Sequence, residues 1–324
     1  MKLNMVQALN QALLQEMERD PDVLILGEDV GVDGGVFRVT DGLLQKFGAE
    51  RVIDTPLAES GIVGAAIGMA AYGLRPVAEI QFMGFVYEAY HQIVDHAARL
   101  RNRTRGRYTV PMVVRMPYGA GVRALEHHSE STEALFCHIP GLVVVTPSTP
   151  RDAKGLLTSA IRADDPVIFL EPKRLYRAGK QEIPEEPEEI PLGKARMARE
   201  GEDLTIIAWG AMVPVAQAAA EEAEKAGIFP EILDLRTLSP LDEEAVLESV
   251  ARTGRALVVH EAPRNCGLGA EISARIMEKS LLHLEAPVLR VTGQDITVPL
   301  AQNEDLYYPS PQRVRLAINK IMEW

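Results

Sequence analysis

One carboxylate in the sequence lies where it could take part in chemistry. Glu59 is the only charged residue between Thr55 and Tyr72, in a stretch that is otherwise apolar and helical in pattern. Burying an unpaired carboxylate costs several kcal/mol, so such a group needs either a partner or a role. Two interpretations are open at this point. Glu59 either complements the positive end of a core helix or is a catalytic acid held against apolar walls.

Glycines recur along the same stretch, at positions 61, 64, 68 and 73. Because glycine has no Cβ, it lets another backbone or helix approach closely. The apolar run is too short to cross a bilayer, which takes about 20 residues. We therefore expect a buried helix that lies in an interface or under a cofactor, in a protein that does not span a membrane.

Two further sites carry residues with chemical potential. Glu28 follows the strand-like run Val23–Leu26, which places it at the carboxyl end of a strand, where open α/β sheets bind ligands. His127 and His128 follow a glycine-rich loop over residues 118–122. A histidine pair there is either functional or a solvated part of the loop. No spacing of His, Cys, Asp and Glu resembles a zinc site, and there is no Gly-x-Ser-x-Gly motif.

Alternating strands and helices must position these residues. Strands that alternate with helices predict a parallel sheet covered on both faces. In the first half we expect strands at 23–26, 76–80, 111–116, 142–146 and 166–170, and helices at 4–20, 59–72, 84–103, 130–137 and 150–163.

A change of composition separates two parts of the chain. Residues 182–191 are acidic and stiffened by proline, as in a linker. Beyond them we expect strands at 204–209, 231–235, 256–260 and 288–291, and helices at 212–226, 241–252 and 269–282. The prediction is an α/β protein with a parallel-sheet domain over residues 1–185, a linker region over 186–203, and a smaller α/β domain over 204–324.

The overall composition excludes several classes. The 324 residues are 47% hydrophobic and 25% charged, which is ordinary for a globular protein. A net charge of −12 argues against nucleic-acid binding and favours a basic protein partner. The two cysteines, Cys137 and Cys266, suit a reducing compartment and are expected to be small buried hydrophobes. The first residues carry no signal or transit pattern, so we expect a cytoplasmic protein, or a mitochondrial matrix protein in its mature form.

Several of these segments together resemble a known family. The pieces are Glu59 followed by Gly64-Ala65-Ala66-Ile67-Gly68, the turn 27–31, the entry 54–56, the His128 segment and the stretch 234–241. In combination they resemble the beta chain of the thiamine diphosphate-dependent 2-oxo acid dehydrogenases, the decarboxylating component of the pyruvate and branched-chain complexes. The resemblance implies a pyrimidine-binding domain followed by a domain like the C-terminal domain of transketolase.

The resemblance also implies roles for particular residues. Glu59 would hydrogen-bond the pyrimidine ring nitrogen N1′ of the cofactor, and His128 would assist reductive acylation of a lipoyl group. The adjacent His127 leaves open which of the two histidines works. The residues implied to bind the cofactor are Glu28, Leu57, Glu59, Gln81 and Phe85. In the wider thiamine motif a Gln often follows the last glycine, and here Met69 stands in its place.

The other half of the thiamine motif pair is missing. Thiamine enzymes bind Mg²⁺ and the diphosphate at a Gly-Asp-Gly sequence, and this chain contains none. In the resembling family an alpha chain holds both, in an α2β2 heterotetramer with active sites between chains. Relatives also bind K⁺ through backbone carbonyls, here near Met112, Ala160 and Asp165, although Ala163 replaces an Asp of those relatives.

Substrate and partner surfaces are less determined. Pyruvate, branched-chain 2-oxo acids and acetoin all remain open as substrates, with the segments 128–140 and 175–178 slightly closer to branched-chain members. The resemblance implies docking of the basic subunit-binding domain of a lipoyl acyltransferase core on the C-terminal domain. Glu285 and Trp324 are candidates for that contact. The alternative to an enzyme subunit is a catalytically silent scaffold of the same fold.

Overall fold

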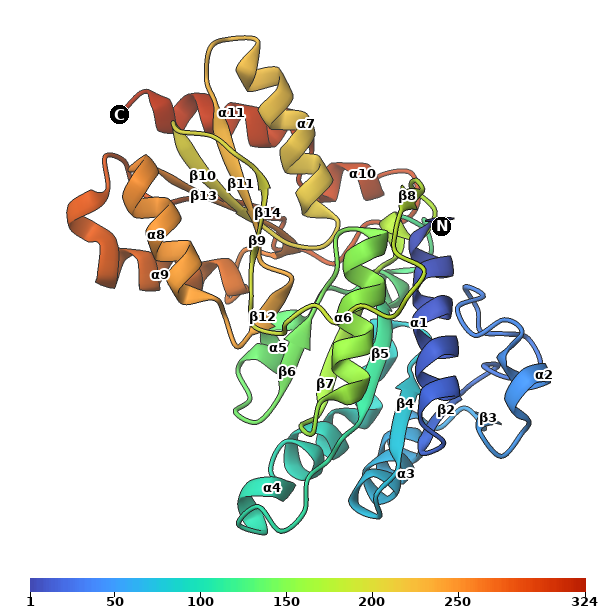
Figure 1. The fold of residues 1–324 in the computed structure, drawn as a ribbon. Coiled ribbons are helices and arrows are strands. Elements are labelled where there is room, and N and C mark those ends of the chain that lie inside the picture. Colours follow the sequence, from blue (N-terminus) through green and yellow to red (C-terminus); the bar gives the residue numbers. More distant parts are fainter.

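Two open sheets, each covered by helices, make up the chain (Figure 1). The computed structural model describes residues 1–324. The large sheet has seven strands in the order β12-β6-β7-β5-β4-β2-β3, parallel except where β12 joins antiparallel to β6. Its strands are β2 (Val23–Gly27), β3 (Val52–Asp54), β4 (Arg75–Glu79), β5 (Val113–Tyr118), β6 (Val143–Val145), β7 (Val167–Pro172) and β12 (Thr237–Ser239).

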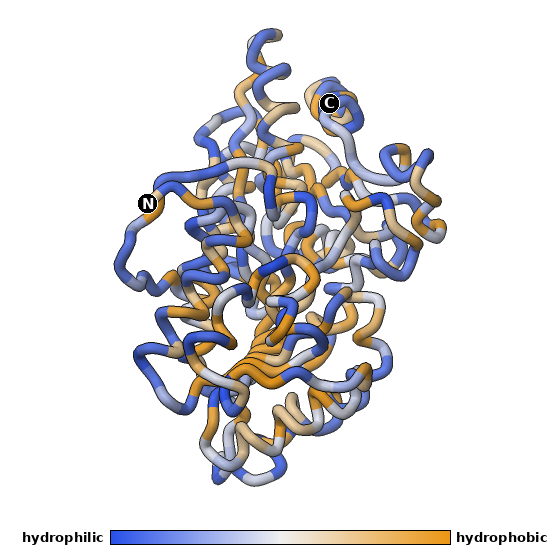
Figure 2. The backbone as a smooth tube through the Cα atoms, turned by 90° about the vertical axis from the view of Figure 1, so that its right-hand side faces the viewer, coloured by the Kyte–Doolittle hydropathy of each residue, from blue (hydrophilic) through white to orange (hydrophobic).

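Helices cover both faces of this sheet, as the alternation predicts. Along β2, Val23 and Ile25 belong to the core shared with α1 (Met5–Arg19) and α6 (Pro150–Arg162). Leu24 and Leu26, which point the other way, belong to the core shared with α3 (Glu59–Ala71). In Figure 2 the apolar strands of the large sheet form the orange group of segments inside the lower half of the molecule.

The long helix expected over residues 84–103 is broken into three pieces. They are a 3₁₀ segment at Met83–Ala89, a π-helical segment at Gln92–Ala97 and the short helix α4 at Leu100–Arg103. Gly84 lies directly under the carbonyl of His127, where any Cβ would clash. The start of this segment therefore packs against the loop that carries His127. The helical pattern of the sequence gives no sign of this contact.

The smaller sheet has five strands in the order β14-β13-β10-β11-β9, with only β9 antiparallel to its neighbour. Helices α7 and α11 share one core with it, whereas α8 and α9 belong to a core that also contains residues of the large sheet. The hydrophobic interior is thus continuous between the two domains. The elements are β9 (Arg196–Arg199), β10 (Leu204–Ala208), β11 (Pro230–Asp234), β13 (Ala256–Pro263), β14 (Leu289–Gly293), α7 (Met212–Glu224), α8 (Glu243–Thr253), α9 (Leu268–Ser280) and α11 (Pro311–Met322).

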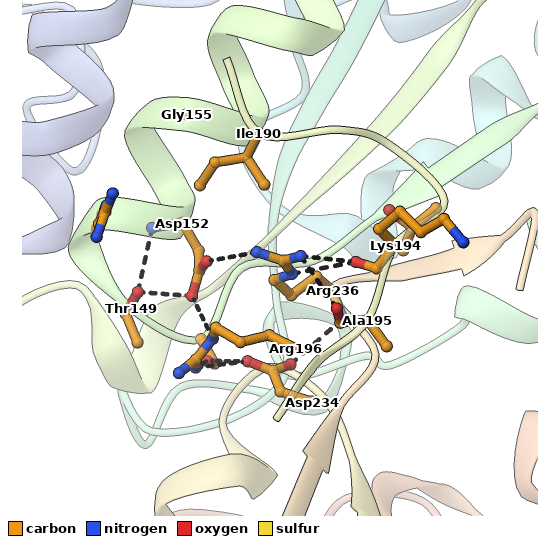
Figure 3. A network of polar contacts seen from close by, with 12 residues as sticks. Thr149, Asp152, Gly155, Ile190, Lys194, Ala195, Arg196, Asp234 and Arg236 are labelled. Atoms are coloured by element: carbon orange, nitrogen blue, oxygen red, sulfur yellow. Dashed lines mark hydrogen bonds and ion pairs between the residues drawn. The ribbon is translucent and has the colours of Figure 1, made fainter. Parts of the chain in front are cut away.

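A network of ion pairs joins the domains (Figure 3). Asp152 of α6 contacts the guanidinium groups of Arg196 and Arg236 at 3.5 and 3.3 Å, and Arg196 also contacts Asp234 at 2.9 Å. Burial raises the pKa of Asp234 to about 6, with Arg196 opposing the rise. The segment 234–241 is therefore part of this joint, because Asp234 and Arg236 belong to it and β12 continues into the large sheet.

Some short elements carry no clear signal in the sequence. Strand β9 lies inside the region 186–203 expected to be a linker, so part of that region is built into the second sheet.

No helix has the length and apolar character needed to cross a membrane. The remaining elements are β1 (Lys2–Leu3), α2 (Leu43–Phe47), α5 (Glu133–Cys137), β8 (Gln181–Glu182), α10 (Glu304–Tyr307) and the 3₁₀ turns at Glu126–His128, Lys173–Leu175 and Leu281–His283.

Candidate active site

The carboxyl ends of β2 and β4 meet where the strand order of the large sheet reverses. From β2 the chain passes to β3 on one side and then to β4 and β5 on the other. Open α/β sheets bind ligands at such a switch point. Glu28 follows β2, Gln81 lies just beyond β4, and Glu59 is the first residue of α3. The structure therefore carries three of the predicted residues toward one edge of the sheet.

Glu59 is buried without a partner in this chain. It is 7% exposed, and its carboxylate takes part in no hydrogen bond or ion pair. The pKa of Glu28 is raised by burial, then by the charge of Glu59 and by Asp29. One oxygen of Glu28 is also buried without a hydrogen bond. Two neighbouring carboxylates that lack donors make a site that a hydrogen-bond donor on a ligand would stabilise.

The turn after β2 is tied to the segment that leads into α3. The carboxylate of Asp54 accepts hydrogen bonds from the backbone N–H groups of Gly31 and Val32, at 2.6 and 3.0 Å. The side chain of Gln81 donates to Asp29 at 2.9 Å. These bonds bring together pieces that are far apart in sequence and hold the floor of the site.

The two histidines lie against an aromatic wall. The ring of His128 is 4.5 Å from Phe82 and 5.3 Å from Phe85, and that of His127 is 5.6 Å from Phe85. Burial lowers the pKa of His128, and the positive charges of His127 and Lys173 lower it further. At any pH above this lowered pKa the imidazole of His128 is neutral. Its Nδ1 atom, which is buried, then has no hydrogen-bond partner within the chain.

One face of α3 is exposed in this chain, and whether it lies in an interface or under a cofactor stays a prediction. Gly61, Ala65 and Gly68 lie on this face, and Leu57, just before the helix, is 78% exposed. Ile62, Val63 and Ala66 on the opposite face are buried. The segment is apolar all round, but this chain covers only one side of it. The exposed side is therefore free to contact another molecule.

Comparisons with known proteins match both domains. Residues 1–179 match the family "Transketolase, pyrimidine binding domain", and residues 193–314 match "Transketolase, C-terminal domain". The chain is 56% identical over 319 residues to "Pyruvate dehydrogenase E1 component subunit beta" of Acholeplasma laidlawii, covering 98% of each chain. It is 51% identical to the protein of the same name from Bacillus subtilis, covering 100% of this chain and 99% of the relative.

The chain belongs to the beta-subunit family of the 2-oxo acid dehydrogenases. A solved structure described as "Split gene transketolase, inactive beta4 tetramer" has the same fold, with a TM-score of 0.81 and 22% identity over 99% of this chain and 98% of the other. The fold class and the family expected from the sequence are both confirmed. Family membership also implies the use of thiamine diphosphate.

The residues present fit the pyrimidine end of that cofactor. An aminopyrimidine carries both hydrogen-bond donors and acceptors, and the unpartnered oxygens of Glu28 and Glu59 lie where such a group could bond. The carboxylates of this site therefore fit the aminopyrimidine end of the cofactor.

Two of the three carbonyls implied for K⁺ accept hydrogen bonds within the chain. Those of Met112 and Ala160 accept hydrogen bonds from the backbone of Val167 and Ala163. The guanidinium of Arg75 donates to the carbonyls of Ile161 and Ala163, at 3.1 and 2.9 Å, and pairs with Asp164 at 3.0 Å. The Asp165 side chain pairs with Arg101 at 2.6 Å. K⁺ binding in this family member stays a prediction.

One expectation about a single residue was wrong, and one residue near the site was missed. Cys266 is exposed rather than buried, because it lies at a turn with φ of 53° before α9. Sequence reasoning also missed Lys173, which is 5% exposed and donates to the carbonyl of His128 at 2.5 Å. Its only signal was a lysine directly after a buried strand, and nothing in the sequence links it to His128.

Proposed function

We propose that this chain is the beta subunit of a pyruvate dehydrogenase, which decarboxylates pyruvate on thiamine diphosphate together with an alpha chain. The observation that carries the proposal is the buried, unpartnered carboxylate of Glu59 beside Glu28 at the switch point of the sheet. Pyruvate is favoured over branched-chain 2-oxo acids because the relatives at 56% and 51% identity are named pyruvate dehydrogenase subunits.

Glu59 acts at the ring nitrogen N1′ of the aminopyrimidine in this proposal. When bound, thiamine diphosphate supplies the carbanion chemistry that lets a 2-oxo acid lose carbon dioxide. Glu59 holds the proton shared with N1′, and its apolar surroundings exclude the water that would compete for that bond. Glu28, whose pKa is raised by burial and by the charge of Glu59, lies beside it and is proposed to contact the same ring. Leu57 and Phe85 pack on the ring, and Gln81 is oriented by its bond to Asp29.

His128 serves the second half of the reaction. Reductive acylation breaks the sulfur–sulfur bond of a lipoyl group. The electron pair that remains when the 2-oxo acid loses carbon dioxide forms the bond from carbon to one sulfur, and the other sulfur leaves with the electrons of the broken bond and takes a proton. A neutral imidazole can accept a proton and pass it to that second sulfur. Of the two histidines, His128 is the one with a buried free nitrogen and the closer contact with Phe82. We therefore assign this role to His128.

An alpha chain completes the site. This sequence has no Gly-Asp-Gly, so Mg²⁺ and the diphosphate are assigned to the alpha chain of an α2β2 heterotetramer. The uncharged face of α3 at Gly61, Ala65 and Gly68 offers a close-packing surface to a second helix. On the C-terminal domain, Glu285 and Trp324 are 60% and 69% exposed and remain our candidates for docking the basic domain of the acyltransferase core.

Calorimetry tests the divided site. Thiamine diphosphate with Mg²⁺ should bind the purified pair of alpha and beta chains but not this chain alone. Tight Mg²⁺-dependent binding to the isolated chain would contradict the proposal. The reconstituted pair should also turn over pyruvate with a higher kcat/KM than 3-methyl-2-oxobutanoate or acetoin. The reverse order would change the substrate and leave the divided site intact.

A further inference from the structure

The loop that leads to His128 is held by the second domain. It begins after β5 with Gly119 and Gly121, whose φ angles of 73° and 114° favour glycine. A Cβ at Gly119 would lie 2.7 Å from a carboxylate oxygen of Glu261, which is the last but two residue of β13. The glycines therefore let the loop backbone approach a carboxylate from the other domain.

Two buried carboxylates of the second domain accept consecutive N–H groups of this loop. The N–H of Ala120 donates to Glu261 at 2.7 Å, and that of Gly121 donates to Glu304 of α10 at 2.9 Å. Glu261 and Glu304 are only 4% and 1% exposed. Hydrogen bonds from backbone N–H groups to ionised carboxylates are stronger than those between neutral groups.

Lys173 joins the start of the loop to its functional end. Its ammonium group donates to the carbonyls of Gly119 and His128. Burial lowers the pKa of Lys173 to about 8, and the charges of Glu261 and Glu304 oppose that shift. The two carboxylates therefore hold the loop directly and also stabilise the cation that holds His128.

This arrangement costs more than packing alone would require. The second oxygen of Glu304 is buried without a hydrogen bond, and a buried charge without full partners is destabilising. Apolar side chains at these positions could join the domains at lower cost. What they could not do is fix two successive backbone groups of the loop.

We propose that Lys173, Glu261 and Glu304 are positioning residues for His128, so that the C-terminal domain supports the lipoyl-dependent step rather than decarboxylation. The inference rests on the role proposed above for His128. Glu59 and Glu28 lie on other elements of the site and receive none of these bonds. The two half-reactions should therefore respond differently when the clamp formed by these three residues is loosened.

Two assays on the reconstituted alpha and beta chains test the inference. Decarboxylation of pyruvate is followed with a dye as electron acceptor, and reductive acylation is followed with a lipoylated lipoyl domain. Glu304→Ala should lower kcat for the lipoyl domain about 10-fold or more, since small misplacements of a catalytic group have effects of this size, and leave the dye assay within about 2-fold. Glu304→Gln, which keeps the accepting oxygen, should recover most of the lost rate. Glu221→Ala, at an exposed residue without an ion pair, is the matched control.

Other results would overturn the inference. Equal losses in both assays would mean that Glu304 only maintains the fold, and an unchanged lipoyl rate would mean that the clamp is irrelevant. If Glu304→Ala does not fold, Glu304→Asp gives the same test, because it keeps the charge and withdraws it from Gly121. His128→Gln is measured alongside: if it spares the lipoyl rate, the role proposed for His128 fails and the positioning role fails with it. If His128→Gln lowers only the lipoyl rate and the Glu304 variants do not, the positioning role is wrong. The role proposed for His128 then still stands.

Discussion

Replacing Arg115 by methionine should destabilise the first domain strongly. Arg115 lies on β5 and is 1% exposed. Its guanidinium donates two hydrogen bonds to Glu171 of β7, at 2.8 and 2.7 Å, and a third to Glu79 of β4. Both carboxylates are buried as well. Arg115→Met keeps most of the volume but leaves two buried carboxylates facing each other.

The size of the effect follows from this geometry. Removing one partner of a buried ion pair costs about 3–5 kcal/mol, whereas loss of the side chain's packing is minor because methionine fills most of the space. For a domain of this size the loss corresponds to a fall in Tm of about 10 °C. The effect should reach the site, because Tyr176 donates to Glu171 at 2.5 Å and the rings of Phe37 and Phe82 continue from Tyr176 toward His128.

The loss should depend on pH in a defined direction. Burial raises the pKa of Glu79, and in the native chain Arg115 opposes that rise. Without Arg115 the folded-state pKa rises further, so the carboxyl group favours the folded chain at low pH and loses that contribution as the pH rises through the raised value. The deficit of Arg115→Met relative to the native chain should therefore shrink between pH 7 and pH 5.

Urea unfolding followed by circular dichroism measures both effects. Arg123→Met, at a residue whose side chain is 63% exposed and whose partner Asp305 is 59% exposed, is the matched control and should cost less than about 1 kcal/mol. The triple variant with Glu79→Gln and Glu171→Gln should recover much of the loss. A cost below about 1 kcal/mol for Arg115→Met, or a deficit that grows on acidification, would refute the reasoning.

Three further predictions concern the site and the joint. Glu59→Gln should change the free energy of unfolding by no more than about 1 kcal/mol, because the substitution keeps the size of the side chain and removes a helix-end interaction of about 0.3–1 kcal/mol; a larger loss in urea unfolding would argue for a structural partner. Arg236→Met should cost about 1–3 kcal/mol by removing a partner of Asp152 at the domain joint, seen as a lower urea midpoint, and no change would remove the joint from the account. His127→Asn should move the limb of the lipoyl-dependent pH–rate profile that reports His128 to higher pH, because burial and then His127 lower the pKa of His128; a shift to lower pH would contradict this.

The regular elements of the fold could be predicted because their apolar patterns are local. Strand β2, with side chains alternating between two cores, and helix α6, with its Thr149 cap and Pro150, are examples. The short strands β9 and β12 could not be predicted, since their pairing is decided by distant segments. On α3 the sequence pattern shows that the helix is apolar all round, but it does not show which face this chain covers, because that depends on distant segments.

The carboxylates of the candidate site could be predicted from the sequence, whereas the residues that hold the His128 loop could not. Glu59 was conspicuous as a lone charge in an apolar run, and Glu28 as an acid at the end of a strand. The clamp on the His128 loop had no such signal, because Lys173, Glu261 and Glu304 come from three separate segments. Only the fold shows that two carboxylates of the second domain accept hydrogen bonds from one loop of the first.

The most direct test of the central claim is the dye-linked decarboxylation rate of Glu59→Gln in the reconstituted alpha and beta assembly. If Glu59 shares a proton with the cofactor, kcat should fall about 10²–10⁴-fold while the assembly stays intact by size-exclusion chromatography. A rate within about 2-fold of the native assembly, outside the range expected for loss of an acid–base group, would contradict the account and leave the chain as a scaffold.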